Sequence, residues 1–403
     1  MSATNARPIG RILLLALLPI GDTLLTTPTI RALRERYPRA RITALAHASA
    51  APVLHCVPEV DEVVVLPIGR DWAGFGPLMR TLRSLRAQRF DVAITFTTPA
   101  YKWVSFVCKV PLRTYMKFEP LWWLLPRDRT RWRSTHATRH YYDCARELDL
   151  PPWETVSHRP YLVLPESERG AAYLFLRRHG IAPAPGAARA GPLIALHAGA
   201  AGASGLKRWP PERFAELADR LQRTWGARIL LLGGREETAL AGVIAADMRE
   251  GEPIIATGAV SLLTSFALIA SCDLFIGNDS SLLHAAAALG TPYIGIVGPT
   301  SPASFHPVGR HPRQGTLVQP SPPCRWPQHF VGGDLPWRRP CCQGTCRALA
   351  ALRADAVLAA ATVLLQRRFA TRLRHVVPRP ALLQGVGDRP VRSADRRSRY
   401  HQA

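Results

Sequence analysis

The sequence predicts an α/β protein built from two doubly wound domains, and three observations support this prediction. The chain has 403 residues, which is more than a single hydrophobic core usually serves. Continuous apolar runs alternate along it with stretches of helical pattern, and this alternation is typical of parallel sheets covered by helices. The alternation stops in an Ala-, Pro- and Gly-rich stretch at 179–192 and then starts again.

The first domain is expected to cover residues 1–178. Its opening run, RILLLALL at 11–18, is apolar throughout, as a parallel strand buried on both faces requires. The segment TTPTIRALRERYP at 26–38 predicts a helix with Thr27 as its N-cap and Pro28 at its first position. Further strands are expected at 41–47, 60–67 and 90–98, with a helix at 76–89.

The second domain is expected to cover residues 193–350, after a linker at 179–192 whose composition suits a hinge. It repeats the alternation, with strands expected at 193–199, 228–234, 253–258, 273–278 and 292–299, and helices at 210–226, 236–248, 261–272 and 281–290. A helix at 351–370 and a basic, disordered tail at 371–403 complete the chain. Two such domains facing each other favour a substrate site between them.

The composition narrows the class of protein. A hydrophobic share of 47% and a charged share of 20% are typical of a folded protein and argue against disorder. The net charge of +23 indicates an anionic partner, which leaves nucleic acid, an acidic membrane leaflet and phosphorylated substrates open. The apolar run Ile12–Ile20 is too short to span a bilayer. No small-residue cleavage site follows this run, so we interpret it as a buried strand rather than a secretory signal.

The cysteines do not form a secreted disulfide framework. Four stand singly among apolar neighbours, which suits free thiols in a reducing cytoplasm: Cys56, Cys108, Cys144 and Cys272. Four others cluster late in the chain: Cys324, Cys341, Cys342 and Cys346. Their spacing is not that of a zinc ribbon, so buried thiols or a disulfide are favoured over a metal site.

The strongest local signal for a binding site is CDLFIGNDSSLLHAAAALGTP at 272–292. A strand ends near Gly277 and a helix begins at Ser280 or Ser281, so free backbone N–H groups are available to bind a phosphate. His284 falls on the first turn of this helix as a further donor, and Asp279 can accept from hydroxyls or hold the loop. The alternative is that Asp279 and Ser280 merely cap the helix.

A second signal is HAGAAGASGLKRWPPERF at 197–214. The small residues Gly202, Ala203 and Ser204 allow backbone N–H groups to approach a diphosphate closely. Lys207 would add a point charge to that diphosphate. A solvated surface loop is the alternative interpretation of the same residues.

A third signal is LLGGREET at 231–238, where Glu236 or Glu237 can accept from ribose hydroxyls. Either glutamate can equally be a favourable charge in the first turn of a helix. The sequence contains no G-x-G-x-x-G after a strand and no G-x-x-x-x-G-K-[ST], so dinucleotide and P-loop signatures are absent.

Together these stretches resemble glycosyltransferase family nine, the ADP-heptose:lipopolysaccharide heptosyltransferases. The resemblance runs from about Arg11 to Ala361 and includes GDTLLTTPTIRALR, GASGLKRWPPERFAELADRL, GNDSSLLHAAAALGTPYIGIVGPTSP and the late cysteines. It implies the GT-B architecture, in which two Rossmann-like domains face each other across a cleft. The C-terminal domain would bind the donor, the N-terminal domain the acceptor, and the helix at 351–370 would cross back.

The resemblance also implies roles for individual residues. Asp22 corresponds to the general base of the family, which would deprotonate the acceptor hydroxyl opposite the leaving nucleotide. Lys207 corresponds to a phosphate-binding lysine, and Glu236 or Glu237 lies near the ribose-binding glutamate. The loop and helix start at the sugar diphosphate correspond to Asp279, Ser280, Ser281 and His284, and Ser281 stands where the family usually has glycine.

The segment at 101–133 mixes aromatic and basic residues, which suits a membrane interface and anionic lipid headgroups. We expect acceptor contacts from Gly21, Lys102, Lys117, Trp122 and Trp123. The alternative is that half of the aromatic residues belong to the core.

The predicted function is an inverting, metal-independent transfer of a heptose-type sugar from a nucleotide donor, expected to be ADP-heptose. The acceptor would be the lipopolysaccharide core or another anionic, lipid-linked saccharide at the cytoplasmic face of the inner membrane, where the protein would bind peripherally. No cofactor is expected. One alternative is a catalytically silent nucleotide-sugar-binding relative. The other is a basic nucleic-acid-binding protein, although the sequence contains no recognised nucleic-acid module.

Overall fold

The computed structural model describes residues 9–67, 75–96, 101–115, 135–181, 191–200, 205–321 and 346–376. The predicted binding residues Gly202, Ala203, Ser204, Lys117, Trp122 and Trp123 lie outside these ranges. The chain divides into two units, Met1–Leu365 and Gln366–Ala403. Of the second unit, the structure describes only helical residues that end α14 (Ala354–Val376).

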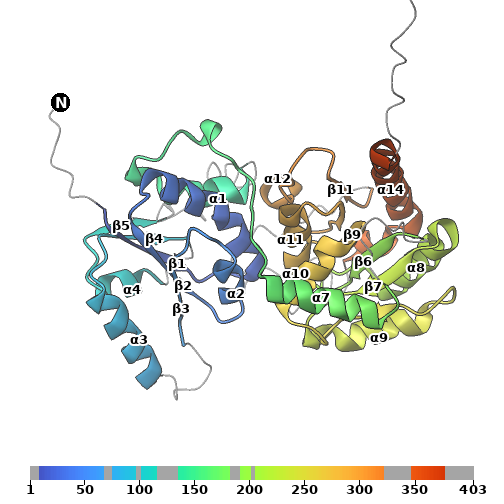
Figure 1. The fold of residues 1–403 in the computed structure, drawn as a ribbon, viewed down its shortest axis with the longest axis horizontal. Coiled ribbons are helices and arrows are strands. Elements are labelled where there is room, and N and C mark those ends of the chain that lie inside the picture. The colour runs from blue at the N-terminus through green and yellow to red at the C-terminus, as the bar shows by residue number, and fades with distance from the viewer. Residues whose placement is uncertain are drawn as a thin grey trace, which may run out of the picture. The chain divides into compact units, whose positions relative to one another are not determined.

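The first sheet is parallel throughout, with strand order β3-β2-β1-β4-β5 (Figure 1). Its strands are β1 (Arg11–Ala16), β2 (Arg41–Ala46), β3 (Glu62–Val65), β4 (Val92–Thr95) and β5 (Leu112–Tyr115). The helices of this half are α1 (Ile20–Arg36), α2 (Ala51–His55), α3 (Phe75–Ala87), α4 (Lys102–Val107) and α6 (Ala137–Asp143). Every residue of β1 after Arg11 is buried, as predicted for a strand covered on both faces.

The second sheet is also parallel, with order β11-β10-β9-β6-β7-β8. Its strands are β6 (Leu193–His197), β7 (Arg228–Leu231), β8 (Ile254–Ile255), β9 (Leu274–Asn278), β10 (Tyr293–Ile296) and β11 (Gly315–Val318). Its helices include α8 (Pro211–Trp225), α9 (Thr238–Asp247), α10 (Leu262–Ser271), α11 (Ser281–Leu289) and α12 (Pro302–Phe305). The two sheets confirm the α/β architecture predicted from the sequence.

The start of α1 differs from the sequence prediction. The helix begins at Ile20 after Pro19, so Thr27 is not its N-cap and Pro28 lies inside it. A proline in a helix interior leaves the carbonyl four residues earlier without its N–H donor. Here the Thr27 hydroxyl donates to that carbonyl, on Leu24, at 2.8 Å. Because Thr27 repairs the missing bond, the helix continues through Pro28 and holds Asp22 in its first turn.

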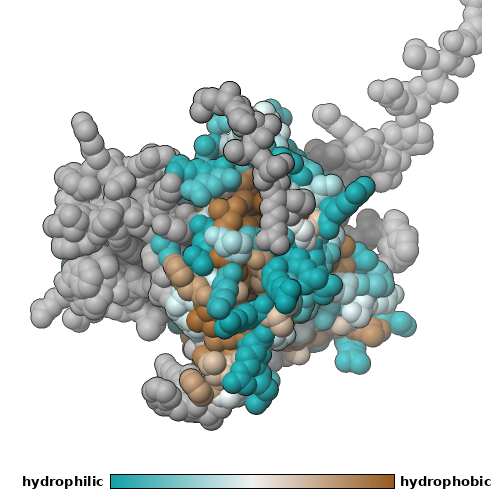
Figure 2. All heavy atoms as spheres, turned by 90° about the vertical axis from the view of Figure 1, so that its left-hand side faces the viewer, coloured by the Kyte–Doolittle hydropathy of each residue, from teal (hydrophilic) through white to brown (hydrophobic). Residues whose placement is uncertain are grey.

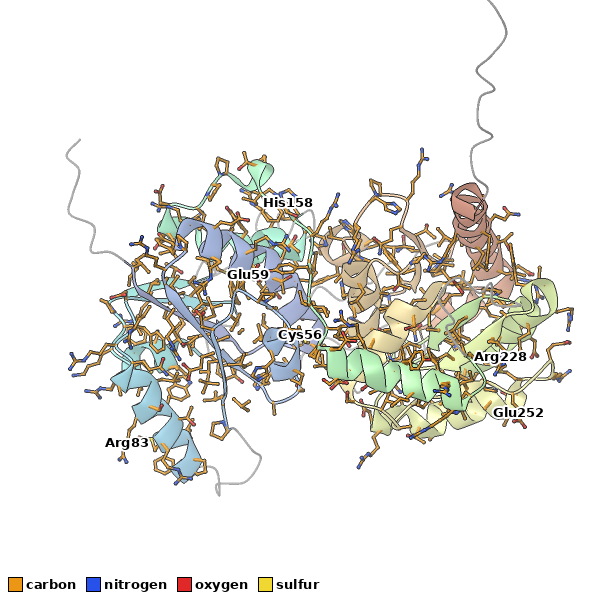
Figure 3. All side chains as sticks on the ribbon, in the orientation of Figure 1. Cys56, Glu59, Arg83, His158, Arg228 and Glu252 are labelled. Atoms are coloured by element: carbon orange, nitrogen blue, oxygen red, sulfur yellow. The ribbon has the colours of Figure 1, made fainter. Side chains whose placement is uncertain are left out.

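One apolar cluster joins the two sheets. Leu24 of α1 and Val53 of α2 belong to the same buried cluster as Leu268 of α10 and Leu283 of α11. The helix α7 (Glu166–Arg178) packs against α10 (Figure 1). Just before α7, the backbone N–H of Val163 donates to the Cys56 carbonyl at 2.7 Å. Figure 3 shows Cys56 beside the start of α7. The first unit is therefore a continuous body rather than two loosely tethered halves.

The C-terminal elements of the first unit pack on α8. After α13 (Arg347–Ala351), the Leu352 carbonyl accepts from the buried indole N–H of Trp209 at 3.0 Å. Arg220 of α8 pairs with Asp355 at the start of α14. The expected crossing of the last helix back to the first domain stays a prediction, as do the domain boundaries. No helix among the described residues is long and apolar enough to cross a membrane.

We expect Thr27→Val to lower the free energy of unfolding by ~1–3 kcal/mol, because a buried carbonyl loses its donor. The Thr27 hydroxyl also accepts from the Tyr161 N–H, at 3.0 Å. Urea denaturation measures the change. Thr29→Val is the matched control, since the buried Thr29 hydroxyl has no hydrogen-bond partner among the described residues. Equal losses in the two variants would contradict the role given to Thr27.

Candidate active site

The candidate site lies where the strand order of each sheet reverses, which is where open α/β sheets bind ligands. In the first sheet, β1 lies between β2 and β4. The chain adds β2 and β3 on one side of β1 and then β4 and β5 on its other side. Asp22 follows the carboxyl end of β1. In the second sheet, β6 and β9 are the corresponding central pair. His197 ends β6, and Asp279 and Ser280 follow β9.

Asp22 is held by a buried tyrosine. Its Oδ1 accepts from the Tyr141 hydroxyl at 2.8 Å, and the Tyr141 ring packs edge-on against Phe96. Burial raises the pKa of Asp22, while the Tyr141 hydrogen bond and the charge of Lys207 partly offset that rise and Asp279 adds to it. Asp22 therefore lies in electrostatic reach of charged residues from the second sheet, in an environment that increases its affinity for a proton.

The starts of α1 and α11 are in direct contact. A Cβ added at Gly21 would lie 3.4 Å from both the His284 ring and the Ser281 Cα. This is ordinary van der Waals distance, so the two helix ends lie close enough for a methyl group at this position to touch both of them. The contact brings the first turn of α1, which contains Asp22, close to the β9–α11 segment.

Lys207 and Asp279 form an ion pair within the second half of the site. The Lys207 ammonium lies 3.0 Å from Asp279 Oδ2. Burial alone would raise the pKa of Asp279, but the charge of Lys207, the neighbouring His284 and hydrogen bonds from Thr300 and Lys207 outweigh it and lower that pKa. Asp279 is therefore ionised at neutral pH, and Lys207 is positioned by it beside the start of α11.

His284 is a buried side chain with unused bonding capacity. Its Nε2 lies 4.0 Å from Asp279 Oδ1, and its Nδ1 has no hydrogen-bond partner within the described part of the chain. Desolvation lowers the pKa of His284, and Asp279 only partly opposes that shift. A neutral imidazole in this position can donate to or accept from a ligand.

Ser280 occupies the N-cap position of α11, but its side chain does not cap the helix. Its hydroxyl instead lies 3.0 Å from His197 Nδ1. The other ring nitrogen of His197 lies 3.1 Å from Glu237 Oε2, which also accepts from the Gly234 N–H at 2.9 Å. Because its N-cap residue makes no side-chain capping bond, the start of α11 has backbone N–H groups that can bind an anion.

The two candidate glutamates differ in their surroundings. Glu236 is exposed, whereas the carboxylate of Glu237 turns inwards against Gly199 and Gly233, where an added Cβ would overlap it. Glu237 thereby joins the β7–α9 segment to His197. His197 was not predicted as a site residue, although it is a polar residue at the end of the apolar run LIALH.

The structure brings together most of the predicted site residues that it describes. Asp22, Lys207, Asp279 and His284 form one electrostatic group across the two sheets. Of the predicted acceptor residues, Gly21 lies at this contact and Lys102 begins α4, where burial lowers its pKa. The described cysteines are buried free thiols: Cys56, Cys108, Cys144, Cys272 and Cys346.

The two parallel sheets, with charged residues gathered where their central strands end, define a GT-B type glycosyltransferase fold. The family model for glycosyltransferase family 9 (heptosyltransferase) matches residues 78–328, and the chain belongs to this family. The family assignment and the GT-B fold predicted from the sequence are thereby confirmed.

Several relatives and solved structures are similar over most of the chain. Lipopolysaccharide heptosyltransferase 2 of Salmonella typhimurium is 28% identical over 320 residues, covering 74% of this chain and 86% of the relative. The Escherichia coli K12 protein of the same name has the same identity and coverage. The structure of E. coli ADP-heptose lps heptosyltransferase II matches with TM-score 0.67 and 24% identity, covering 89% of this chain and 99% of that one. A family 9 glycosyltransferase from Veillonella parvula matches with TM-score 0.71 and 23% identity, covering 90% and 100%.

We expect Tyr141→Phe to raise the pKa of Asp22, because the carboxylate loses the hydrogen bond that stabilises its ionised form. The phenyl ring keeps its packing against Phe96. A pH titration of the aspartate side-chain carbonyl signals by ¹³C NMR measures the shift. Tyr142→Phe, in the same helix, is the control, because the Tyr142 hydroxyl donates to the Pro151 carbonyl instead. An unchanged pKa of Asp22 in Tyr141→Phe would show that Tyr141 does not stabilise the ionised carboxylate.

Proposed function

We propose that the protein transfers a heptose-type sugar, with inversion, from an ADP-linked donor to an acceptor hydroxyl of a lipopolysaccharide core or related lipid-linked saccharide. The observation that carries this proposal is the position of Asp22. It is a half-buried carboxylate on one sheet in electrostatic contact with Lys207 and Asp279 from the other. The names of the similar heptosyltransferases support the choice of sugar and acceptor.

In this proposal Asp22 is the general base. Inversion requires attack on the anomeric carbon from the face opposite the leaving nucleotide, so the base and the diphosphate must lie on opposite sides of the sugar. Asp22 on α1 lies within electrostatic reach of Lys207 and Asp279 at the start of α11, which suits this requirement. Its raised pKa also suits proton abstraction, since a base works best when its pKa approaches the working pH.

Groups around α11 stabilise the leaving diphosphate in this proposal. The diphosphate gains negative charge as the glycosidic bond breaks, and preorganised donors lower the energy of that step. Lys207 supplies a positive charge, His284 Nδ1 a free bonding site, and α11 its uncapped N–H groups. A divalent metal often neutralises the charge of a leaving diphosphate. Because these groups can do so instead, we propose a metal-independent reaction.

We expect Asp22→Asn to reduce transfer by about 10²–10⁴-fold, the usual contribution of a positioned general base. Transfer from ADP-heptose to a heptose-deficient lipopolysaccharide core measures activity, and calorimetry measures donor binding. Donor binding should survive, since the groups proposed to hold the diphosphate remain. Asp149→Asn is the matched control, because Asp149 is an exposed aspartate that pairs with Arg36 at the surface.

The stability of Asp22→Asn separates a lost base from a damaged fold. Because the pKa of Asp22 is raised in the folded chain, its ionisation destabilises the fold as the pH rises through that pKa. The asparagine variant should therefore melt at a higher temperature than the wild type at neutral pH, with a smaller difference in acid. Full activity in Asp22→Asn would refute the assignment, and loss of donor binding in a stable variant would count against a pure base role.

We also propose that the protein binds peripherally to an anionic membrane through an aromatic–basic surface on the first half. Its exposed apolar side chains are Phe75, Trp103, Phe106, Val107 and Leu112. Its basic side chains are Arg80, Arg83, Arg86, Lys109 and Arg113, with the Arg113 guanidinium 4.2 Å above the Phe106 ring. Figure 2 faces this end of the first half and shows brown apolar surface among teal side chains, and Figure 3 shows Arg83 on the outer side of α3. Such a mixture suits acidic lipid headgroups.

We expect Trp103→Ser/Phe106→Ser to weaken binding to phosphatidylglycerol-containing vesicles by about tenfold or more, since burying aromatic surface contributes at least ~1.4 kcal/mol. Vesicle co-sedimentation measures the affinity, and neutral phosphatidylcholine vesicles should bind less. Leu174→Ser/Val243→Ser removes exposed apolar residues from α7 and α9 as the control. Equal binding of the two double variants would argue against this surface.

A further inference from the structure

Lys207 and Arg208 are consecutive cations on a backbone that is held in place on both sides. The Arg208 N–H closes a tight turn by donating to the Gly205 carbonyl at 2.9 Å, and Gly205 has a φ of 65°. The next residue, Trp209, is buried, and its backbone N–H donates to Asn278 Oδ1 at 3.0 Å. The backbone from which the two cationic side chains leave is therefore fixed by β9 and by its own turn.

The two cationic side chains reach different segments of the site. Lys207 lies 3.0 Å from Asp279, which follows β9, and it is also within electrostatic reach of Asp22. Arg208 is within electrostatic reach of Glu237, which follows β7. In the second sheet, β6 lies between β9 and β7. The two cations therefore serve opposite sides of the carboxyl end of β6.

The guanidinium of Arg208 has donors that the protein does not fully use. Its Nε is buried and has no hydrogen-bond partner among the described residues. Its Nη2 donates to the Ala200 carbonyl at 3.4 Å, which is longer than the about 2.9 Å of a usual N–H···O bond. A guanidinium presents its donors in a planar fork that matches the oxygens of a phosphate. The unused donors therefore suit an anionic ligand on the β7 side of the site.

The proposed reaction determines which end of the donor each cation meets. The anomeric carbon has to lie beside Asp22, so the phosphate attached to the sugar lies on the side of Asp22. Lys207 is the cation on that side. The nucleoside end of the same diphosphate then extends away from Asp22, towards the side that Arg208 serves.

We propose that Arg208 binds the phosphate next to the ribose, while Lys207 binds the phosphate attached to the sugar. Arg208 is thus a binding residue for the nucleoside monophosphate half of the donor, and Lys207 for the group that gains charge on bond cleavage. The inference rests on the proposed donor site and divides its diphosphate between two cations. A residue that only stabilised the loop would lower the melting temperature without distinguishing one phosphate from the other.

The experiment measures binding of AMP and ADP to the full chain by calorimetry, with AMP added as a competitor of ADP. AMP carries only the phosphate next to the ribose, whereas ADP carries both phosphates. Arg208→Gln removes the positive charge and keeps a polar side chain, and Lys207→Gln does the same at the neighbouring position. Arg213→Gln is the matched control, because Arg213 pairs with Glu216 on α8. Melting temperatures check the folding of each variant.

We expect Arg208→Gln to weaken the binding of AMP and ADP by a similar factor of about 10–100, since both lose a charged hydrogen-bond donor. Lys207→Gln should weaken ADP about tenfold more than AMP, because AMP lacks the second phosphate. Arg208→Lys should recover part of the lost affinity, and Arg213→Gln should bind both nucleotides like the wild type. In the wild type, AMP should also shift the ¹H–¹⁵N signal of the Arg208 Nε–H, a measurement that needs no folded Arg208→Gln protein.

Three results would overturn the inference and leave the donor site standing. They are an unchanged affinity for AMP in folded Arg208→Gln, an equal weakening of AMP and ADP by Lys207→Gln, and an Arg208 Nε–H signal that AMP does not shift. AMP that fails to compete with ADP in the wild type would overturn it as well. Failure of ADP, UDP and GDP all to bind the wild type would overturn the donor site together with the inference.

Discussion

The arrangement of the site depends on the contact between the first turns of α1 and α11. A methyl group at Gly21 would be in ordinary contact with the His284 ring and the backbone of Ser281, so the two helix ends lie close together. The next residue, Asp22, is then fixed by the hydroxyl of Tyr141. A carboxylate from one sheet and a set of anion-binding groups from the other are thereby held together before any ligand arrives.

The charges of this site are balanced within the protein. Lys207 is paired with Asp279, and Glu237 lies 3.1 Å from the His197 ring, so an arriving diphosphate has to compete with Asp279 for Lys207. Burial affects the pKa of Asp22, Asp279 and His284. The net shift of each pKa differs because the neighbouring groups differ. Desolvation keeps proton affinity high at Asp22, whereas at Asp279 it is outweighed by Lys207 and the other neighbours, which keep that carboxylate ionised. Two carboxylates of one site can therefore perform different tasks.

Much of the fold could be predicted from the sequence, because strands buried on both faces read as continuous apolar runs such as RILLLALL. The strands β5 and β11 were not predicted, since they are short edge strands of mixed composition. The start of α1 was predicted wrongly because a Thr-Pro pair usually marks a helix start, and here a side-chain hydroxyl lets the helix pass through the proline. The prediction grouped Lys207, Asp279 and His284 around the donor, and the structure places them together. His197 was missed because its partners lie 40 and 83 residues away, and no local pattern reveals such a pairing.

The apolar cluster that includes Leu24, Val53, Leu268 and Leu283 has a consequence for how the chain loses its structure. Residues of both sheets exclude water together, so neither half can open fully without exposing the interior of the other. The first unit should therefore melt in one cooperative transition. A destabilising substitution in either half should lower the stability of both halves.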